Sequence, residues 1–246
     1  MALTAPHDVD DPVSALKAEM VAGYHILARA GLGGGLLGHL TARSPTGDTF
    51  WTYQLGQSFE EVEADDLREA DFGLNIVAGG GAINPTLKIH ALTYQARPDI
   101  MCIAHHHGTD SVAMGAIGAL LETVDRNAAK FDGELDIIED YDRAHQIAEQ
   151  GEAIIGKLGG KRALILKHHG VLVTGRSVRD TVVATLMLEQ CFAVQLKAMA
   201  ASPTLYRMAE AEIADAKGFL NSDLYVDGTW DYLRRATVRE RTARGW

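Results

Sequence analysis

Two short apolar runs that each end in adjacent histidines constrain this chain more than any other feature. The runs and their endings are Ile100–Ile103 before Ala104-His105-His106-His107-Gly108, and Ala163–Leu166 before Lys167-His168-His169-Gly170. Short apolar runs bounded by turn residues are typical of buried strands. Because successive side chains of an extended chain point to opposite faces, we expect His105 and His107 on one face and His106 on the other.

Paired imidazoles at a strand end are half of a metal site, and the second cluster can complete it. Ligands of α/β sheets gather at strand ends, although a single cluster is equally typical of a hydrogen-bonded core histidine or an exposed one. The chain has no Cys-x-x-Cys motif, which excludes a thiolate-rich structural zinc site. Imidazoles without thiolates favour a catalytic site with an open position for Zn, Mn, Fe or Co. From spacing alone, the third ligand is either histidine of the second cluster.

Composition excludes several other classes of protein. The 246-residue chain has a formal net charge of −10 and no long run of Lys or Arg, which argues against nucleic-acid binding. Its two cysteines, Cys102 and Cys191, lie in apolar contexts, so a disulfide framework is excluded and a reducing compartment fits. We find neither a signal-peptide pattern nor an uncharged apolar stretch of about 18 residues. We therefore expect a cytoplasmic protein that does not bind membranes.

Helical and strand patterns alternate along the chain without a repeat or an interdomain linker, which favours a single α/β domain. Residues 31–35 are glycine-rich, but no Gly-Lys-Ser/Thr follows, so a turn is favoured over a phosphate-binding loop. Residues 119–144 show no clear pattern. The expected helices are 12–30, 61–67, 86–96, 109–118, 144–158, 177–200, 205–220 and 228–243, and the expected strands are 36–43, 49–53, 68–71, 74–77, 100–103, 163–166 and 171–174.

Four motifs in this order resemble the class II aldolase/adducin family over about residues 12–201. They are Gly38-His39-Leu40-Thr41-Ala42-Arg43, the segment His90–Asp99, His105-x-His107, and Leu164–Val173 with Gly175. The resemblance implies a three-layer α/β domain with a central, mostly antiparallel sheet between helices. It also implies a homotetramer with active sites between neighbouring subunits. Residues 1–11 are then a frayed N-terminus, and residues 202–246 a helical extension on the same domain or a neighbouring subunit.

The resemblance also implies a set of metal ligands. They are His105, His107 and His169, because His169 aligns with the histidine of the family's Asn-His-Gly motif and His168 fills the Asn place. One divalent ion per subunit is expected, with Zn or Mn ahead of Fe or Co.

Two departures from the family pattern argue against a simple sugar-phosphate aldolase. Thr86 occupies the place of the catalytic glutamate, four residues before His90, and a threonine hydroxyl cannot accept a proton at neutral pH as a carboxylate can. Leu37-Gly38-His39 replaces the Ser-Gly-Asn segment that helps bind phosphate. The pattern is more similar to a branch that includes adducin-like proteins, decarboxylases of aromatic or hydroxy acids, and metal-dependent oxygenases.

These observations predict a metal-dependent carbon–carbon lyase, first of all a decarboxylase of a small, non-phosphorylated 2-oxo, 2-hydroxy or aromatic acid. A divalent metal can stabilise the enolate that decarboxylation leaves. The reaction needs no base to begin but needs a proton donor afterwards. Alternatives are a class II aldolase, a non-heme iron oxygenase and a non-catalytic adducin-like module.

Several side chains are candidates for contact with the substrate. The proton donor is His39, Tyr141, or a C-terminal tyrosine of a neighbouring subunit such as Tyr225 or Tyr232. His39 is equally typical of a structural hydrogen bond at a strand end. Arg43 can bind a carboxylate through two hydrogen bonds, unless it forms a surface salt bridge, and Thr86 faces the substrate in the place of the glutamate.

Overall fold

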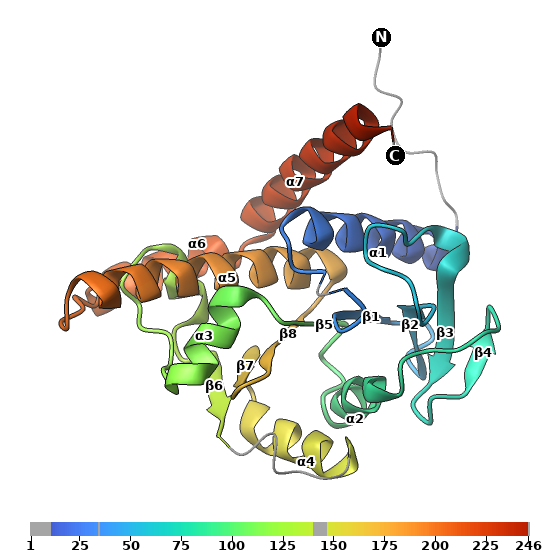
Figure 1. Ribbon diagram of the computed structural model, residues 1–246, viewed down its shortest axis with the longest axis horizontal. Coiled ribbons are helices and arrows are strands. Elements are labelled where there is room, and N and C mark those ends of the chain that lie inside the picture. The colour runs from blue at the N-terminus through green and yellow to red at the C-terminus, as the bar shows by residue number, and fades with distance from the viewer. Residues whose placement is uncertain (1–10, 34, 140–146, 246) are drawn as a thin grey trace.

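The chain folds around one mixed sheet with helices on both faces (Figure 1). The computed structural model describes residues 11–33, 35–139 and 147–245. Within these residues eight strands are ordered β4-β3-β2-β1-β5-β8-β7-β6, and every neighbouring pair is antiparallel except β6 and β7. The strands are β1 (His39–Arg43), β2 (Thr49–Tyr53), β3 (Leu67–Asp71), β4 (Ile76–Ala78), β5 (Cys102–His106), β6 (Leu135–Ile138), β7 (Ala163–Leu166) and β8 (Gly170–Gly175).

Helices form a layer on each side of this sheet. In Figure 1, α1 and α5 lie on one side and α2 and α4 on the other, while α7 extends away from the sheet past α1. The helices are α1 (Pro12–Arg29), α2 (Lys88–Ala96), α3 (Thr109–Ile117), α4 (Ile147–Leu158), α5 (Val178–Ala201), α6 (Glu210–Leu220) and α7 (Asp223–Arg244), and the short 3-10 segments are η1 (Ala64–Asp66), η2 (Pro85–Leu87) and η3 (Asn127–Phe131).

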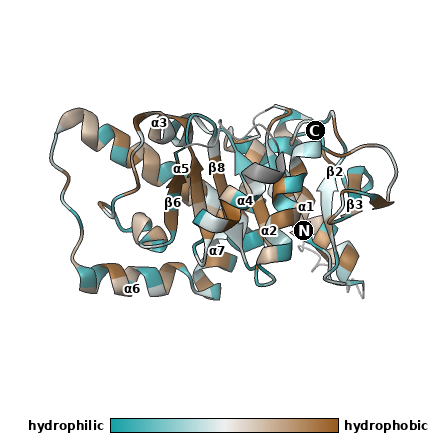
Figure 2. Ribbon diagram, turned by 90° about the horizontal axis from the view of Figure 1, so that it is seen from below, coloured by the Kyte–Doolittle hydropathy of each residue, from teal (hydrophilic) through white to brown (hydrophobic). Residues whose placement is uncertain are grey.

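The sheet lies between two apolar cores, and alternate side chains of its strands point into one core or the other. Cys102 and Ala104 of β5 belong to the core under α1 and α5, whereas Ile103 between them belongs to the core under α2 and α4. Figure 2 shows β6 and β8 predominantly hydrophobic, whereas the outer helix α6 alternates between hydrophobic and hydrophilic residues. A sheet covered on both faces needs apolar side chains on both, which is why its central strands are continuous apolar runs.

Local signals fix the start of the first helix. The Asp11 carboxylate accepts hydrogen bonds from the backbone N–H groups of Val13 and Ser14 at 3.1 and 3.2 Å, and Pro12 occupies the first turn. An N-cap aspartate and an early proline both favour helix initiation. At the buried face, the Tyr24 hydroxyl donates to the carbonyl of Leu40 at 2.5 Å, which ties α1 to β1.

The long helix α5 lies at the centre of the α1/α5 core. By length and hydropathy alone its 24 residues resemble a membrane span, but half of that window is buried inside the protein. It packs against α1, α3, α7, β5 and β8. This surrounding is that of a core helix, so its hydropathy is weak evidence for a membrane.

The α/β fold with a central, mostly antiparallel sheet confirms the prediction. The strand predicted at 49–53 is β2 without change, and α1 and α5 begin and end within a residue or two of their predicted bounds. The segment 119–144, for which the sequence gives no clear pattern, contains η3 and β6, and α7 begins five residues earlier than predicted. Residues 1–10 and 140–146 lie outside the described residues, so the expected frayed N-terminus is described only at Asp11.

Candidate metal centre

Three histidine side chains converge at one end of the central strands. His105 lies in β5, His107 follows the same strand, and His169 lies in the turn between β7 and β8. One ring nitrogen from each histidine lies within 4.8 Å of the other two. The ring centroids of His107 and His169 are 4.5 Å apart, and those of His105 and His169 are 5.2 Å apart. The histidines expected from the sequence therefore form a triad that can bind a metal ion.

The hydrogen bonds of His105 fit metal ligation. Its Nδ1–H donates to the backbone carbonyl of Val171 at 3.0 Å, and its Nε2 lies 2.9 Å from the Nε2 of His107. Ligating histidines in proteins typically donate their other N–H to a carbonyl or carboxylate, which fixes the tautomer. Nitrogens of a tetrahedral zinc site are about 3.3 Å apart, given Zn–N distances near 2.0–2.1 Å. The triad thus fits a metal in chemistry and in size.

The turn before β8 determines which histidine of the second cluster joins the triad. The backbone N–H of His169 donates to the carbonyl of Leu166 at 2.9 Å, which closes the turn. His168 has a φ of 61° and is exposed, and histidine is among the few non-glycine residues enriched in this region. A Cβ at position 170 would collide with the carbonyl of His106, so only glycine allows this close approach. The side chain of His169, rather than that of His168, therefore joins the triad.

Glu189 of α5 anchors the segment that follows His107. Its carboxylate accepts hydrogen bonds from the backbone N–H groups of Asp110 and Ser111, at 2.9 and 3.2 Å, and from the Ser111 hydroxyl. These donors belong to the first turn of α3, where a carboxylate is favoured by the helix dipole. Burial raises the pKa of Glu189, while the bonds to Ser111 and Asp110 oppose that shift. The anchor holds the chain two and three residues beyond Gly108.

His39 lies beside the triad, and Thr86 contacts His39. His39 pairs with His105 across β1 and β5, and the two ring centroids are 5.6 Å apart. The Thr86 hydroxyl donates to Asn84 Oδ1 at 2.7 Å, so its oxygen accepts from His39 Nε2–H at 3.2 Å. These two hydrogen bonds leave His39 Nδ1 as an unprotonated acceptor, and that atom is buried without a hydrogen-bond partner among the described residues.

His90 is a second buried histidine, which the sequence indicated only as part of a family motif. Its Nδ1 lies 2.9 Å from the Thr41 hydroxyl, which also contacts the Tyr94 hydroxyl at 2.8 Å. Its Nε2 is buried without a hydrogen-bond partner among the described residues, and its ring is 5.7 Å from that of His39. The spacing of His90 from Thr86, four residues on, was the available signal, because residues at i and i+4 share a helix face.

Burial keeps these imidazoles neutral. Burial, and next the positive charges that His107 and His169 would carry, lower the pKa of His39 to about 4. Burial and His169 lower the pKa of His107 to about 4, and burial is also the main reason that the pKa values of His90 and His105 lie well below the ordinary range. Neutral imidazole is the form that binds metals. The site is therefore ready for a cation at neutral pH.

The structure places Arg43 away from the triad, which does not support its predicted role in substrate binding. Arg43 lies at the other end of β1, four residues from His39, and donates to four backbone carbonyls. These are the carbonyls of Gly47, Tyr94, Arg97 and Ile100, at 2.6–3.3 Å. A buried guanidinium needs such acceptors, so Arg43 ties the β1–β2 turn to the end of α2. Among the described residues it forms no salt bridge of the kind weighed from the sequence.

Two of the tyrosines considered as proton donors, Tyr225 and Tyr232, are not brought to the triad within the described part of the chain. Tyr225 in α7 packs against Phe219, with ring centroids 5.3 Å apart, and against the α1/α5 core. Tyr232, on the same helix, is exposed. Tyr141 lies outside the described residues. A contribution of Tyr225 or Tyr232 from a neighbouring subunit stays a prediction.

The chain belongs to the class II aldolase and adducin family. The family model described as "Class II Aldolase and Adducin N-terminal domain" matches residues 18–196, which include the triad, His39, Thr86 and His90. The fold agrees, since the chain superposes on L-fuculose 1-phosphate aldolase from Glaciozyma antarctica PI12 with a TM-score of 0.86. That alignment covers 98% of this chain and 96% of the other, at 24% identity.

Two similar bacterial proteins bear the names of different reactions. One is 4-hydroxy-3-prenylphenylpyruvate oxygenase/4-hydroxy-3-prenylbenzoate synthase of Streptomyces roseochromogenus subsp. oscitans. It is 29% identical over 83% of this chain and 74% of its own length. The other is decarboxylase NovR of Streptomyces niveus, which is 29% identical over 68% of this chain and 63% of its own length. The chain is thus an enzyme of the class II aldolase superfamily with a three-histidine site.

Proposed function

We propose that this protein is a divalent-metal-dependent carbon–carbon lyase, specifically a decarboxylase of a small, non-phosphorylated 2-oxo, 2-hydroxy or aromatic acid. The observation that carries the proposal is the composition of the site. The metal-binding cluster found in the described residues consists of three histidines without a carboxylate, and Thr86 contacts His39 where the aldolases have their glutamate.

His105, His107 and His169 would hold the metal, with Zn or Mn as the first expectation and Fe or Co as alternatives. A divalent ion held by three neutral imidazoles keeps its full charge and would stabilise the negative charge that develops on a carbonyl oxygen of the substrate. When an ionised acid loses carbon dioxide, the electrons of the broken C–C bond stay on the substrate carbon, so no base has to remove a proton first. The missing glutamate is therefore a smaller loss for a decarboxylase than for an aldolase.

His39 would handle the proton that replaces carbon dioxide. Its Nε2–H is held by Thr86 Oγ1, so the free Nδ1 can accept a hydrogen bond from a water molecule or a substrate hydroxyl. A water molecule that donates one hydrogen to Nδ1 would be oriented to give its other proton to the substrate carbon, and the hydroxide that remains would combine with the released carbon dioxide to form bicarbonate. His90 would help to position the His39 ring, because the two rings are in contact and the unpartnered Nε2 of His90 lies in the same buried cluster.

An iron-dependent oxygenase is the second candidate, because one similar protein is named as an oxygenase. The open positions of a three-histidine site would suit oxygen binding as well as substrate chelation. The two functions differ in an observable requirement: a decarboxylase releases carbon dioxide without oxygen, and an oxygenase does not.

We also propose that the protein acts as a homotetramer, because the family resemblance implies active sites completed by neighbouring subunits. Light scattering at micromolar concentration should give four times the chain mass of 26.6 kDa. A monomer at that concentration would contradict both the tetramer and a shared active site.

The decisive experiment is a screen of 2-oxo, 2-hydroxy and aromatic acids with protein purified anaerobically and loaded with Zn, Mn or Fe. We expect carbon dioxide release without oxygen for at least one acid, and its loss in His107→Ala. Cleavage of a sugar phosphate as the main activity, or turnover only with iron and oxygen, would contradict the decarboxylase proposal.

A further inference from the structure

A group of cationic side chains surrounds a cavity at the end of the sheet opposite the triad. Lys130, Arg162 and Arg176 line a cavity of about 280 Å³ together with Glu134 and Asn221. An adjoining cavity of about 160 Å³ shares Glu134, Arg162 and Arg176 and adds Arg97 and Lys161. We call these two cavities the basic groove. Five cationic and two acidic side chains, the latter Asp99 and Glu134, line it, whereas the whole chain has 23 basic and 33 acidic residues.

The strands separate this groove from the metal centre. Arg162 directly precedes β7 and Arg176 directly follows β8, whereas His169 lies in the turn that joins the other ends of these strands. The pairing of β5 with β8 shows the same separation. Gly175, next to Arg176, pairs with Cys102 at the start of β5, whereas His105 of the triad pairs with Leu172. A ligand of the groove would therefore be bound a strand length away from the triad.

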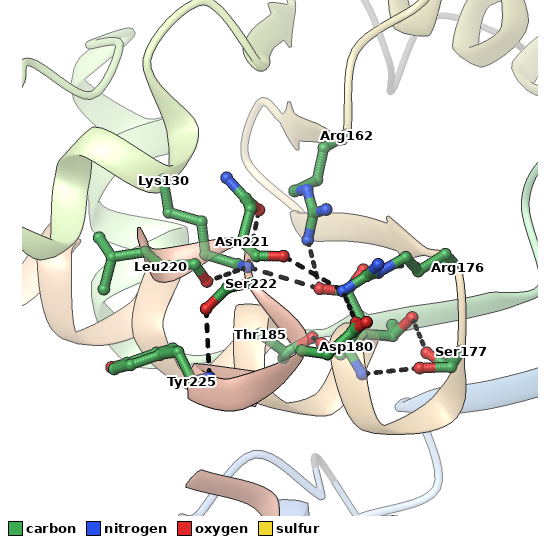
Figure 3. A network of polar contacts seen from close by, with 12 residues as sticks. Lys130, Arg162, Arg176, Ser177, Asp180, Thr185, Leu220, Asn221, Ser222 and Tyr225 are labelled. Atoms are coloured by element: carbon green, nitrogen blue, oxygen red, sulfur yellow. Dashed lines mark hydrogen bonds and ion pairs between the residues drawn. The ribbon is translucent and has the colours of Figure 1, made fainter. Parts of the chain in front are cut away.

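Three cations of the groove, Arg97, Lys161 and Arg176, each pair with a separate carboxylate, whereas the other two share one. Figure 3 shows Lys130 and Arg162 directed at the same carboxylate, that of Asp180. Both reach its Oδ1, at 3.4 and 3.0 Å, and the side chains of Lys130 and Asp180 are only 0% and 1% exposed. Two cations thus share one buried anion. Burial, and next the charge of Arg162, lower the pKa of Lys130 to about 8, against the opposing effect of Asp180.

The two arginines that line both cavities use only part of their hydrogen-bond donors within the described residues. Lys130 is saturated, because it also donates to the carbonyl of Leu220 and to Asn221 Oδ1, at 3.0 and 2.9 Å. Arg162, in contrast, has five N–H donors and within the described residues uses one, to Asp180. Arg176 donates through one nitrogen to the Asn221 carbonyl and to Asp223, and its side chain is 52% exposed. Both guanidinium groups keep donors for a ligand.

From this arrangement we propose that the basic groove is a second ligand site, which binds the phosphate group of a small phosphorylated molecule between Arg162 and Arg176. A phosphate monoester carries about −1.5 to −2 charges at pH 7 and three acceptor oxygens, which suits two arginines with several unused donors. A carboxylate has two oxygens, which one guanidinium fork can occupy alone. The combined size of the groove leaves room beside the phosphate for a small organic part. The site would recognise a phosphorylated effector, distinct from the non-phosphorylated substrate proposed for the metal centre.

Equilibrium dialysis of the full chain with radioactive inorganic phosphate tests this proposal. We expect saturable binding of one phosphate per chain. Arg176→Gln, which alters an exposed side chain and should leave the fold intact, should weaken binding about tenfold, the effect of losing one charge-assisted hydrogen bond. Arg162→Gln should weaken it at least as much. Glu134→Gln should strengthen it, because it removes an anion from the lining.

Two control variants distinguish phosphate binding in the groove from a general effect of charge and from binding at the metal centre. Arg235→Gln removes the same charge from an exposed position of α7 outside the groove and should bind as the unmodified protein does. His169→Ala should also bind normally, so failure of the metal centre and failure of this site are distinguishable. Absence of saturable binding, undiminished binding by both arginine variants, or loss of binding in His169→Ala would each overturn the proposal.

Discussion

The two ends of the central sheet hold buried polar groups of opposite kinds. Where β5 ends, neutral imidazoles cluster and two of their nitrogens, on His39 and His90, have no partner in the described residues. Where β8 ends, Lys130, Arg162 and Asp180 are charged and joined by hydrogen bonds. Lone pairs without donors attract cations, whereas guanidinium donors without acceptors attract anions. One sheet therefore offers opposite binding chemistry at its two ends.

Because the two ends differ in charge, substitutions at one end should mainly affect stability and substitutions at the other should mainly affect function. A buried charge that loses its partner costs more than a buried neutral group does, so the charged end should contribute more to stability. Replacing one of the neutral histidines should cost less free energy of unfolding. It should instead change metal binding and turnover.

The largest stability effect is expected from Asp180→Asn. Asp180 is almost fully buried and accepts hydrogen bonds from Lys130, Arg162 and the backbone N–H of Arg176. Removing its charge leaves two cations unbalanced, and we expect a loss of about 3–5 kcal/mol in the free energy of unfolding. Urea unfolding monitored by circular dichroism measures this loss. The control is Asp223→Asn, whose side chain is 79% exposed and which should cost less than about 0.5 kcal/mol. Equal effects of the two variants would show that the buried network contributes little.

The neutral end should make the metal-free protein sensitive to acid. The folded-state pKa of His39 is about 4 and that of His106 about 3, whereas the pKa of a histidine in the unfolded chain lies near its ordinary value of 6.5. Between these values the unfolded chain binds more protons than the folded one. The stabilising contribution is therefore complete above pH 6.5 and is lost as the pH falls toward the folded pKa values.

At pH 5.5, each of the buried residues His39, His90, His105 and His106 should lower the free energy of unfolding by roughly 1 kcal/mol relative to pH 7.5. Urea unfolding of chelator-treated protein at both pH values measures the difference. His106→Gln, which removes one buried histidine outside the triad, should reduce it by roughly 1 kcal/mol. Equal stability at both pH values would contradict the neutral, buried state of these imidazoles.

Replacement of His39 should affect turnover more than metal binding. If Nδ1 handles the proton or orients the water that supplies it, His39→Ala should lower kcat about a hundredfold, as is usual for the loss of a general acid–base group. Metal content should stay near that of the unmodified protein. A variant with unchanged kcat would assign His39 a structural role only, and the exposed His168→Ala is the matched control.

The smallest effect is expected from Thr86→Glu. This change introduces a carboxylate next to His39, at the position where the family resemblance implies the glutamate of the aldolases. A decarboxylase should lose activity by a few-fold, because the new anion lies near a substrate carboxylate and competes for the metal. An increase in carbon dioxide release, or new aldolase activity of comparable rate, would show that Thr86 is not what distinguishes this site.

Local patterns in the sequence predicted one end of the sheet much better than the other. Alternation along β5 places His105 and His107 on one face, and the turn Lys167-His168-His169-Gly170 needs only short-range geometry. The strand β6 was missed because its partner β7 lies 28 residues further on and its own apolar pattern is short. The basic groove depends on residues such as Lys130 and Asp180, which are 50 positions apart, and no local pattern brings them together. The surroundings of Arg43 were equally out of reach, because its acceptors come from α2 and the chain before β5.

Metal analysis of anaerobically purified protein tests the central claim most directly. The account predicts one divalent ion per chain, nearly complete loss of that ion in His169→Ala, and its retention in His168→Ala, because the turn directs only His169 into the triad. Elemental analysis by mass spectrometry on the three proteins, purified in parallel, gives the answer. A metal-free unmodified protein that takes up no ion when supplied with Zn, Mn or Fe would contradict the account. So would greater metal loss in His168→Ala than in His169→Ala.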